Sequence, residues 1–200
     1  SWRDNYHHHN TMLWALYTPG KIDRDTLRRE RFRRPLLDAG VDATTADAIA
    51  EHLDSEYLRR LALLPNVIEG AHATLKALRA AGCHIGILSN GFKDTQQQKL
   101  RSSGLDALVD LVVLGDDIDV NKPDRRIYDY ARQRAAALYP EIPCTPRDCL
   151  MVGDNADTDI RGALDAGWDA IWLNPNGTPR PDAPANRARN IPSLQALLQQ

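Results

Sequence analysis

The sequence predicts an α/β protein, a doubly wound parallel sheet with a helical segment in front of it. After residue 65, short apolar runs alternate with helical stretches, a rhythm typical of parallel strands covered by helices on both faces. Before that point, apolar residues recur only at the spacing of a helix. We therefore expect two domains, a helical one over 1–64 and an α/β one over 65–200.

Three helices are expected in the first domain, over 2–17, 23–40 and 44–64. Asp23 is a residue type that caps helix N-termini, so it suits the start of the second helix. Pro35 lies inside that helix and lacks a backbone N–H, so we expect a kink or an early end there.

The second domain contains short apolar runs that predict four strands, over 84–88, 111–114, 149–152 and 170–173. Helices are expected over 71–81, 94–102, 123–138, 160–166 and 193–199. A proline-rich stretch after the last strand predicts a surface loop, and it contains Pro175, Pro179, Pro181 and Pro184.

Composition excludes several classes of protein. Of the 200 residues, 42% are hydrophobic and 26% are charged, which is ordinary for a folded globular chain. The 25 basic and 27 acidic side chains give a net charge of −2, which argues against a nucleic-acid polymer as partner. No apolar run approaches the roughly 18 residues of a membrane-spanning helix, so no membrane partner is expected. Three cysteines without a Cys-x-x-Cys motif indicate free thiols and a cytoplasmic protein.

The first predicted strand ends in a Ser89-Asn90-Gly91 turn. In doubly wound sheets, ligands bind at the carboxyl ends of the strands, so these ends are where chemistry is expected. The Ser89 hydroxyl and the backbone N–H groups that follow could hold an anion. The same three residues also make an ordinary turn with a helix cap, and the sequence alone leaves both interpretations open.

The second predicted strand leads to Asn121-Lys122-Pro123. Proline suits the first position of a helix, so Pro123 predicts that Lys122 lies at the mouth of the following helix. A lysine in that place could neutralise a phosphate and a nearby carboxylate. The alternative is a solvated lysine without a role.

The third predicted strand runs directly into Asp154. Asp159 falls in the first turn of the next helix, so the two carboxylates can face one spot. Carboxylate oxygens suit Mg²⁺, which also binds substrate phosphates. Asp157 competes with Asp159 for the second acidic position, and it could instead cap the helix.

Together, these motifs resemble those of the haloacid dehalogenase superfamily of phosphohydrolases, and they follow the same order. Residues 88–91 match the second motif, 121–123 the third, and Val152-Gly153-Asp154 with Asp159 the fourth. The helical segment 1–64 resembles the helical cap of that superfamily. The branch that this chain resembles most is that of the pyrimidine 5′-nucleotidases, on the basis of Leu13-Trp14, Gly20-Lys21-Ile22 and the Ser-Asn-Gly turn.

The resemblance implies a Rossmann-like core and a Mg²⁺-dependent phosphomonoesterase that forms an aspartyl-phosphate intermediate. The implied substrate is a small phosphorylated metabolite such as a nucleoside 5′-monophosphate. It assigns catalytic roles to Ser89, Lys122 and Asp154, substrate binding to Ser89, Asn90, Gly91 and Lys122, and metal binding to Asp154 and Asp159. Asp154 is expected to bind the metal directly, and Asp159 through water or by orienting Lys122.

The superfamily's first motif, Asp-x-Asp-x-Thr at the end of an N-terminal strand, has no counterpart in this sequence. Asp4 is no substitute, because no apolar strand precedes it. We therefore expect that the first core strand and the nucleophile lie outside this chain, and that the chain as given is inactive. Two alternatives remain: an inactive relative that only binds phosphate and Mg²⁺, and a 2-haloacid dehalogenase, which needs no metal.

Overall fold

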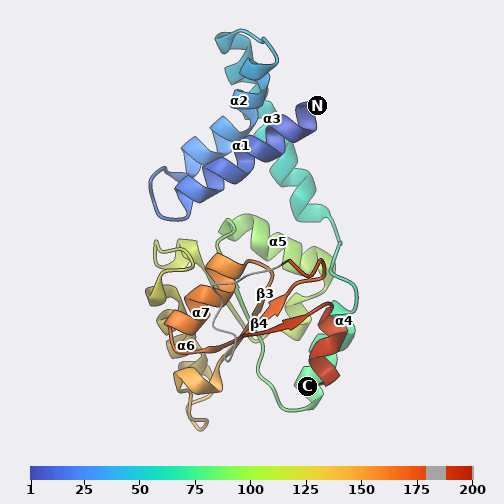
Figure 1. Cartoon of the computed structure of the whole chain (residues 1–200), viewed down its shortest axis with the longest axis vertical. Helices are drawn as coiled ribbons and strands as arrows, with labels where there is room; N and C mark the ends of the chain where they lie inside the picture. Colours follow the sequence, from blue (N-terminus) through green and yellow to red (C-terminus); the bar gives the residue numbers. More distant parts are fainter. Residues whose placement is uncertain (179–187, 200) are drawn as a thin grey trace. The chain divides into compact units, whose positions relative to one another are not determined.

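The computed structural model describes residues 1–178 and 188–199 (Figure 1). The chain forms two compact units, Ser1–Leu64 and Pro65–Gln200. Three of the prolines of the predicted loop, Pro179, Pro181 and Pro184, lie outside the described residues. Among the helices that are described, none combines the length and the apolar character needed to cross a membrane.

The first unit consists of helices α1 (Trp2–Tyr17), α2 (Arg24–Asp38) and α3 (Ala43–Leu63). Each helix begins at a residue whose side chain accepts a backbone N–H of the first turn, and these caps are Ser1, Asp23 and Asp42. The predicted cap at Asp23 is thereby confirmed.

The early end predicted at Pro35 is wrong, because α2 continues to Asp38. A proline inside a helix removes only one backbone donor, and here its ring is fully buried. The last turn is closed beyond it, since the Ala39 N–H donates to carbonyl oxygens of the preceding residues. Packing therefore compensates for the missing hydrogen bond.

A buried ion pair lies in the core of this unit, beside a cluster of Phe32, Leu36, Ala46 and Ala50. The Arg31 guanidinium donates to Asp54, and the two residues are 3% and 5% exposed. Arg31 also lies over the ring of Tyr57, at 4.9 Å from the ring centroid. Burial of charges is costly unless they are paired, so this arrangement joins α2 to α3.

In its described residues, the second unit contains five strands in parallel pairings, β1 (Gly86–Ser89), β2 (Leu111–Leu114), β3 (Leu150–Gly153), β4 (Asp169–Leu173) and β5 (Ala188–Ile191). The four predicted strands are confirmed within a few residues. β5 was not predicted, because its sequence Ala-Arg-Asn-Ile has no apolar run and only Ile191 is buried.

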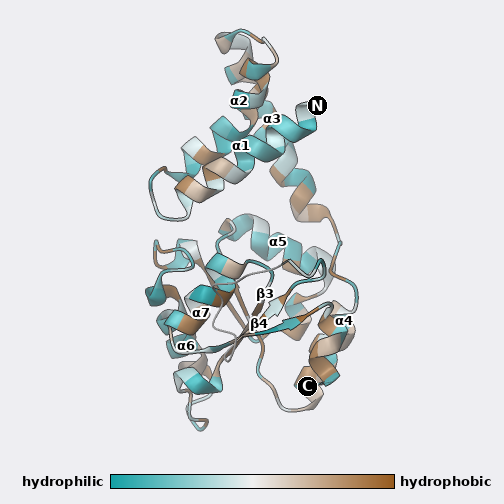
Figure 2. Ribbon diagram, viewed as in Figure 1, coloured by the Kyte–Doolittle hydropathy of each residue, from teal (hydrophilic) through white to brown (hydrophobic). Residues whose placement is uncertain are grey.

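Helix α4 (Ala71–Ala80) precedes β1, and the helices between the strands are α5 (Lys93–Ser103), α6 (Arg125–Leu138) and α7 (Gly162–Asp165). The predicted closing helix is a 3-10 helix over Leu194–Gln199. Figure 2 shows α5 as largely hydrophilic, in agreement with its single buried residue, Leu100. The core of the unit is instead formed by α6, α7 and the strands, around Tyr128 and Trp168.

The strands form two separate parallel sheets in the described residues, β1-β2 and β3-β4-β5. β1 pairs only with β2, and β3 pairs only with β4 in the described residues. β1 and β3 therefore each have one edge without a strand partner there. An unpaired strand edge presents free N–H and C=O groups. The carboxyl ends of β1 and β3 nevertheless carry the residues that the sequence singles out.

Candidate active site

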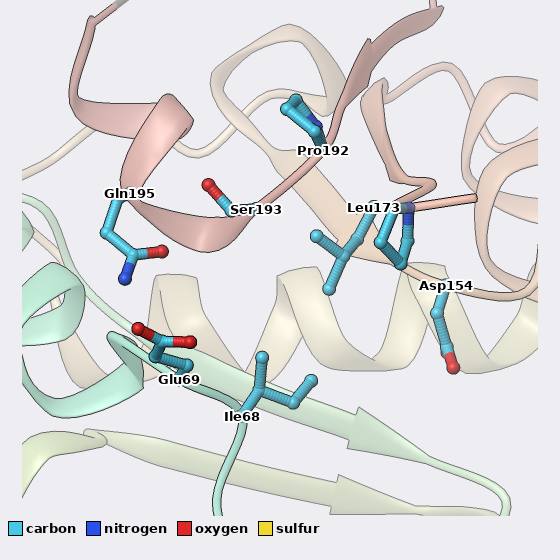
Figure 3. Close-up of a pocket in the computed structure, with 8 residues that line it drawn as sticks. Ile68, Glu69, Asp154, Leu173, Pro192, Ser193 and Gln195 are labelled. Atoms are coloured by element: carbon cyan, nitrogen blue, oxygen red, sulfur yellow. The ribbon is translucent and has the colours of Figure 1, made fainter. Parts of the chain in front are cut away.

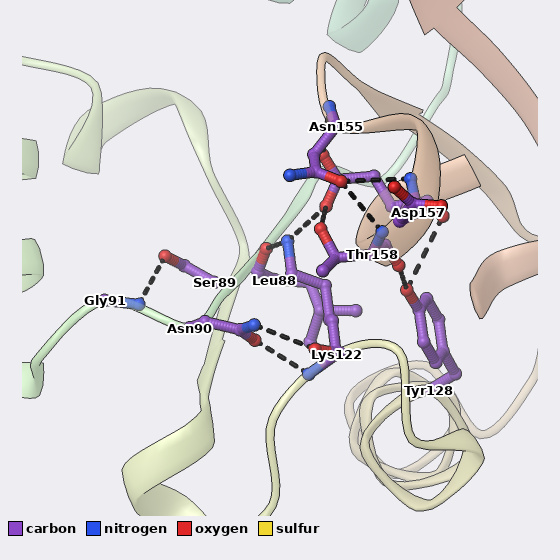
Figure 4. A network of polar contacts seen from close by, with 10 residues as sticks. Leu88, Ser89, Asn90, Gly91, Lys122, Tyr128, Asn155, Asp157 and Thr158 are labelled. Atoms are coloured by element: carbon purple, nitrogen blue, oxygen red, sulfur yellow. Dashed lines mark hydrogen bonds and ion pairs between the residues drawn. The ribbon is translucent and has the colours of Figure 1, made fainter. Parts of the chain in front are cut away.

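A network of polar contacts joins the loops after β1, β2 and β3 (Figure 4). Ser89 ends β1, and Lys122 lies between β2 and α6. Asp159 lies in a π-helical turn, Ala156–Arg161, that follows β3. The structure therefore brings together residues that are more than thirty positions apart in the sequence, and Lys122 is their common partner.

The Lys122 ammonium makes two short contacts. Nζ donates to Asp159 Oδ1 at 2.7 Å and to the Leu88 carbonyl oxygen at 2.7 Å. Lys122 is 8% exposed and Asp159 is 5% exposed, so the pair is buried. The alternative of a solvated lysine is thus wrong: the cation is held at the end of β1 by a carboxylate from the turn after β3.

Asn90 holds the main chain of Lys122 on both sides. Asn90 Oδ1 accepts the Lys122 N–H at 2.7 Å, and Asn90 Nδ2 donates to the Lys122 carbonyl oxygen at 2.9 Å. Because both ends of the amide are engaged, this side chain positions Lys122. Substrate binding by Asn90 stays a prediction. Because the side-chain amide is engaged, the group of Asn90 that is left for a substrate is its backbone N–H.

Pro123 does not occupy the first position of a helix, so that prediction is wrong. The Lys122–Pro123 peptide bond is cis, and α6 begins two residues later, at Arg125. The cap is Asp124, whose Oδ1 accepts the Arg126 N–H at 2.9 Å. Aspartate is a strong N-cap, and it overrides the preference of proline for the helix start.

Ser89 Oγ accepts the Gly91 N–H at 3.0 Å, so the turn that the sequence allows is present. The Ser89 hydroxyl hydrogen remains available for donation to a ligand oxygen. The turn and the anion site are therefore compatible interpretations of the same residues, although the Gly91 N–H is engaged within the turn.

Asp159 is fixed by its neighbours. Its Oδ2 accepts the Asn155 N–H at 3.1 Å, and its carboxylate lies against the backbone of Gly153. A Cβ at residue 153 would come within 2.4 Å of Asp159 Oδ2, so only glycine fits there. The carboxylate is thus oriented toward Lys122.

The turn after β3 is capped by Asn155, a residue that was not among those predicted from the sequence. Its Oδ1 accepts the N–H groups of Asp157 at 3.0 Å and Thr158 at 2.9 Å. The alternative that Asp157 is the cap is therefore wrong. The helical segment also begins earlier than predicted, at Ala156 instead of residue 160. An asparagine two residues after the end of a strand was the available signal.

Tyr128 supports this turn from α6. Its hydroxyl donates to the Thr158 carbonyl oxygen and lies 3.5 Å from the Asp159 carbonyl oxygen. Burial raises the pKa of Tyr128 well above its usual range, so the phenol remains a donor. A Cβ at Gly162 would approach the Tyr128 oxygen to 2.5 Å, which makes glycine necessary at that position too.

Asp154 differs from Asp159 because its carboxylate is free. Its backbone carbonyl accepts the Trp172 indole N–H at 2.9 Å, whereas no described residue contacts the exposed carboxylate by a hydrogen bond or ion pair. Asp154 also borders a cavity of about 520 Å³ in the second unit. Figure 3 shows that cavity with Glu69, Ser193 and Gln195 around it.

The carboxylates of Asp154 and Asp159 fit a magnesium site in their chemistry. Mg²⁺ is commonly held by one or two carboxylates together with waters and a substrate phosphate. No group of three or more histidine, cysteine or acidic residues suited to a metal occurs in the part of the chain that the structure describes. Asp154 is the free oxygen donor of the two, because Lys122 already occupies Asp159.

Known proteins are similar to this chain in both sequence and fold. The family described as haloacid dehalogenase-like hydrolase matches residues 6–167. The pyrimidine 5′-nucleotidase YjjG of Escherichia coli is 32% identical over 191 residues, which is 94% of this chain and 79% of that protein. A phosphoserine phosphatase of Thermus thermophilus is 34% identical over 167 residues, 81% of this chain and 62% of that protein.

The solved structures agree. The putative HAD-hydrolase YfnB of Bacillus subtilis, solved bound to magnesium, superposes with a TM-score of 0.81 at 27% identity. The match covers 99% of this chain and 81% of that one. A 2-haloacid dehalogenase from Pseudomonas syringae superposes with a TM-score of 0.65 at 26% identity, over 98% of this chain and 79% of that one. The resemblance to this family is thereby confirmed, and the chain belongs to the haloacid dehalogenase-like hydrolase family.

Proposed function

We propose that this protein is a Mg²⁺-dependent phosphomonoesterase that acts on a small phosphorylated metabolite, such as a nucleoside 5′-monophosphate. The observation that carries the proposal is the buried Lys122 ammonium, held at the carboxyl end of β1 beside Ser89. A fixed cation and a free hydroxyl donor are what the oxygens of a phosphoryl group require. The similarity to a pyrimidine 5′-nucleotidase and a phosphoserine phosphatase supports the same reaction class.

Each residue has a definite task in this reaction. Lys122 offsets the charge of the transferring phosphoryl group, and Ser89 donates a hydrogen bond to one of its oxygens. Asp159 keeps Lys122 in place, and Asn90 fixes the Lys122 backbone. Asp154 is the direct ligand of Mg²⁺, which supplies further positive charge at the phosphate when it is bound.

The nucleophile in this proposal is an aspartate of a strand outside residues 1–200. It attacks phosphorus, the alkoxide of the substrate leaves, and water then hydrolyses the aspartyl phosphate. The break between the sheets supports the proposal, because β1 and β3 each have one edge free for a further parallel strand in the described residues. A strand inserted there would bring its own carboxyl end close to Ser89 and Asp154.

The coding sequence directly upstream of Ser1 tests the nucleophile. We expect an in-frame apolar strand that ends in Asp-x-Asp-x-Thr. We also expect no hydrolysis of para-nitrophenyl phosphate by residues 1–200 alone in the presence of Mg²⁺. Mg²⁺-dependent turnover by that fragment would contradict the location of the nucleophile, whereas an upstream sequence without the motif would favour a protein that only binds phosphate.

The protein extended by its upstream segment tests the substrate class. We expect phosphate release from a panel of phosphomonoesters, with Mg²⁺ required and nucleoside 5′-monophosphates among the substrates. The second candidate is a 2-haloacid dehalogenase, which the solved structures of such enzymes favour. Halide release from a 2-haloacid without metal, together with no phosphate release from the panel, would select that candidate.

The proposed setting is the cytoplasm, with no nucleic acid and no membrane as partner. The three cysteines are unpaired in the structure, which agrees with a reducing compartment.

A further inference from the structure

Two cysteines lie on either side of the turn that leads from α6 into β3. Between Cys144 and Cys149 the chain makes a 3-10 turn over Pro146–Asp148. The Asp148 carboxylate closes the turn by accepting the Thr145 N–H at 2.8 Å. Because the chain reverses there, Cys149 returns to the neighbourhood of Cys144 just before β3 begins.

The contacts place the two thiols side by side. Cys149 Sγ lies 3.5 Å from the carbonyl oxygen of Thr145, the residue that directly follows Cys144. The side chains of Cys144 and Cys149 also interact with each other. Both residues are partly buried, whereas Cys83, the third cysteine, is exposed. The two thiols thus flank one short turn and interact with each other, which is the arrangement that a disulfide between them requires.

Arg132 of α6 adds a positive charge to the pair. Its Nη1 donates to the Cys144 carbonyl oxygen at 2.9 Å, and its own carbonyl oxygen accepts from Cys144 Sγ at 3.7 Å. These two contacts fix Cys144 against α6, on one side of the turn. The surroundings of Cys144 thus differ from those of a cysteine that only fills space.

We propose that Cys144 and Cys149 form an intramolecular disulfide when the protein meets a small-molecule disulfide, so that the start of β3 is a redox-controlled modification site. The inference is independent of the proposed phosphomonoesterase activity, because it depends on no residue of the candidate active site.

The chemistry needs two exchange steps. The Cys144 thiolate attacks one sulfur of oxidised glutathione, and one glutathione thiolate leaves. Cys149 then loses its proton and attacks the Cys144 sulfur, which forms the disulfide and releases the second glutathione. The two protein thiols together lose two electrons and two protons, and the two electrons reduce one oxidised glutathione to two thiols.

The order of attack follows from the surroundings of Cys149. Burial and the neighbouring Cys144 raise the pKa of Cys149 to about 12, so its thiol stays protonated at neutral pH. Cys144 therefore begins the reaction.

A peptide map tests the proposal directly, because Arg147 lies between the two cysteines. The 200-residue chain is equilibrated in mixtures of oxidised and reduced glutathione, quenched with acid, alkylated and digested with trypsin. We expect peptides 135–147 and 148–161 to appear as a linked pair, with a mass two hydrogens below their sum. The linked fraction rises with the share of oxidised glutathione, and dithiothreitol abolishes it.

Two variants serve as controls. Cys83→Ser is expected to keep the linked pair, which shows that the exposed cysteine takes no part. Cys149→Ser is expected to lose the pair and to trap glutathione on Cys144, with far-UV circular dichroism confirming that it folds. The proposal is overturned if wild-type Cys144 and Cys149 remain reduced at every mixture, or if each carries its own glutathione without a linked pair.

Discussion

Lys122 is the residue on which the charge balance of the candidate site depends. Its ammonium lies 2.7 Å from Asp159, and both side chains are buried. Lys122→Met leaves the Asp159 carboxylate buried without its cation, so we expect the free energy of unfolding to fall by about 3–5 kcal/mol. Urea denaturation followed by circular dichroism measures the loss.

Two further variants show whether the loss of unfolding free energy comes from breaking the buried ion pair or only from removing a lysine. Lys122→Met combined with Asp159→Leu removes both charges, and we expect it to recover much of the stability. Lys93→Met breaks the exposed contact between Lys93 and Asp117, 2.8 Å apart, and is expected to change stability little. A Lys122→Met protein as stable as the wild type would contradict the importance of the buried pair.

Asp154 is expected to show the opposite behaviour. Its carboxylate is exposed and free of contacts with the described residues, so Asp154→Ala leaves the unfolding free energy unchanged. In a protein that includes the proposed N-terminal strand, we expect the same change to abolish Mg²⁺-dependent phosphate release, because Asp154 is the proposed direct ligand of the metal. Phosphate release against Mg²⁺ concentration is the measurement.

Asp157→Ala is the matched control, since Asp157 is an exposed acidic residue of the turn that follows Asp154. We expect it to retain Mg²⁺-dependent activity. Near-normal turnover by Asp154→Ala would refute the ligand role of Asp154. Loss of turnover by Asp157→Ala would instead assign a metal-binding role to the Asp157 carboxylate.

The positions of Ser89 and Asp154 at strand ends followed from the sequence, because apolar runs and strand ends can be read along the chain. The task of Asn90 could not be read in this way. Its amide is engaged with the Lys122 backbone, a partner thirty-two residues away. Only the folded structure shows which loop a given side chain meets.

Glycine at residue 153 is what allows the end of β3 to approach the turn that follows it. A Cβ there would lie 2.4 Å from Asp159 Oδ2, closer than nonbonded atoms allow. Gly153→Ala must therefore push Asp159 away from Lys122, and we expect a loss of about 1–3 kcal/mol in the free energy of unfolding. Chemical denaturation of the single variant provides the value.

Gly86→Ala in β1 is the matched control for this element. A Cβ at residue 86 meets only Leu111, at 3.8 Å, which is an ordinary van der Waals distance. We expect Gly86→Ala to be nearly neutral. Equal losses for the two alanine variants would show that the backbone freedom of glycine matters at both positions, and not the contact with Asp159.

At the level of elements, the sequence predicts which helices and strands exist better than it predicts where they begin and end. The strands and most helices were found because apolar periodicity is local. Helix starts depend on which of several neighbouring residues caps the first turn. Asp124 and Asn155 do so here, and both displace a predicted start. The extension of α2 beyond Pro35 depends on burial, which a local pattern does not reveal.

At the scale of the whole molecule, the strands differ in how many pairing partners they have. β4 is paired on both sides, by β3 and β5, whereas β1 and β3 each have one strand partner in the described residues. The expectation of a central strand outside this chain came from the missing first motif, and it stays a prediction. The break between the two sheets is the place that we propose for that strand. The pairing partner of β4, β5, escaped prediction because it is only partly apolar.

Hydrogen exchange tests this view of the molecule. A backbone amide is protected from exchange when its N–H is hydrogen-bonded to a neighbouring strand. It exchanges only when the structure around that bond opens. In residues 1–200 alone, we expect peptides that span β4 to take up deuterium more slowly than those that span β1 or β3. In the protein extended by its upstream segment, a strand between β1 and β3 would bond their free edges, so uptake there should slow while β4 changes little. Equal uptake at β1 and β3 in the two proteins would contradict the proposed place of that strand, even if the extended protein hydrolyses phosphomonoesters.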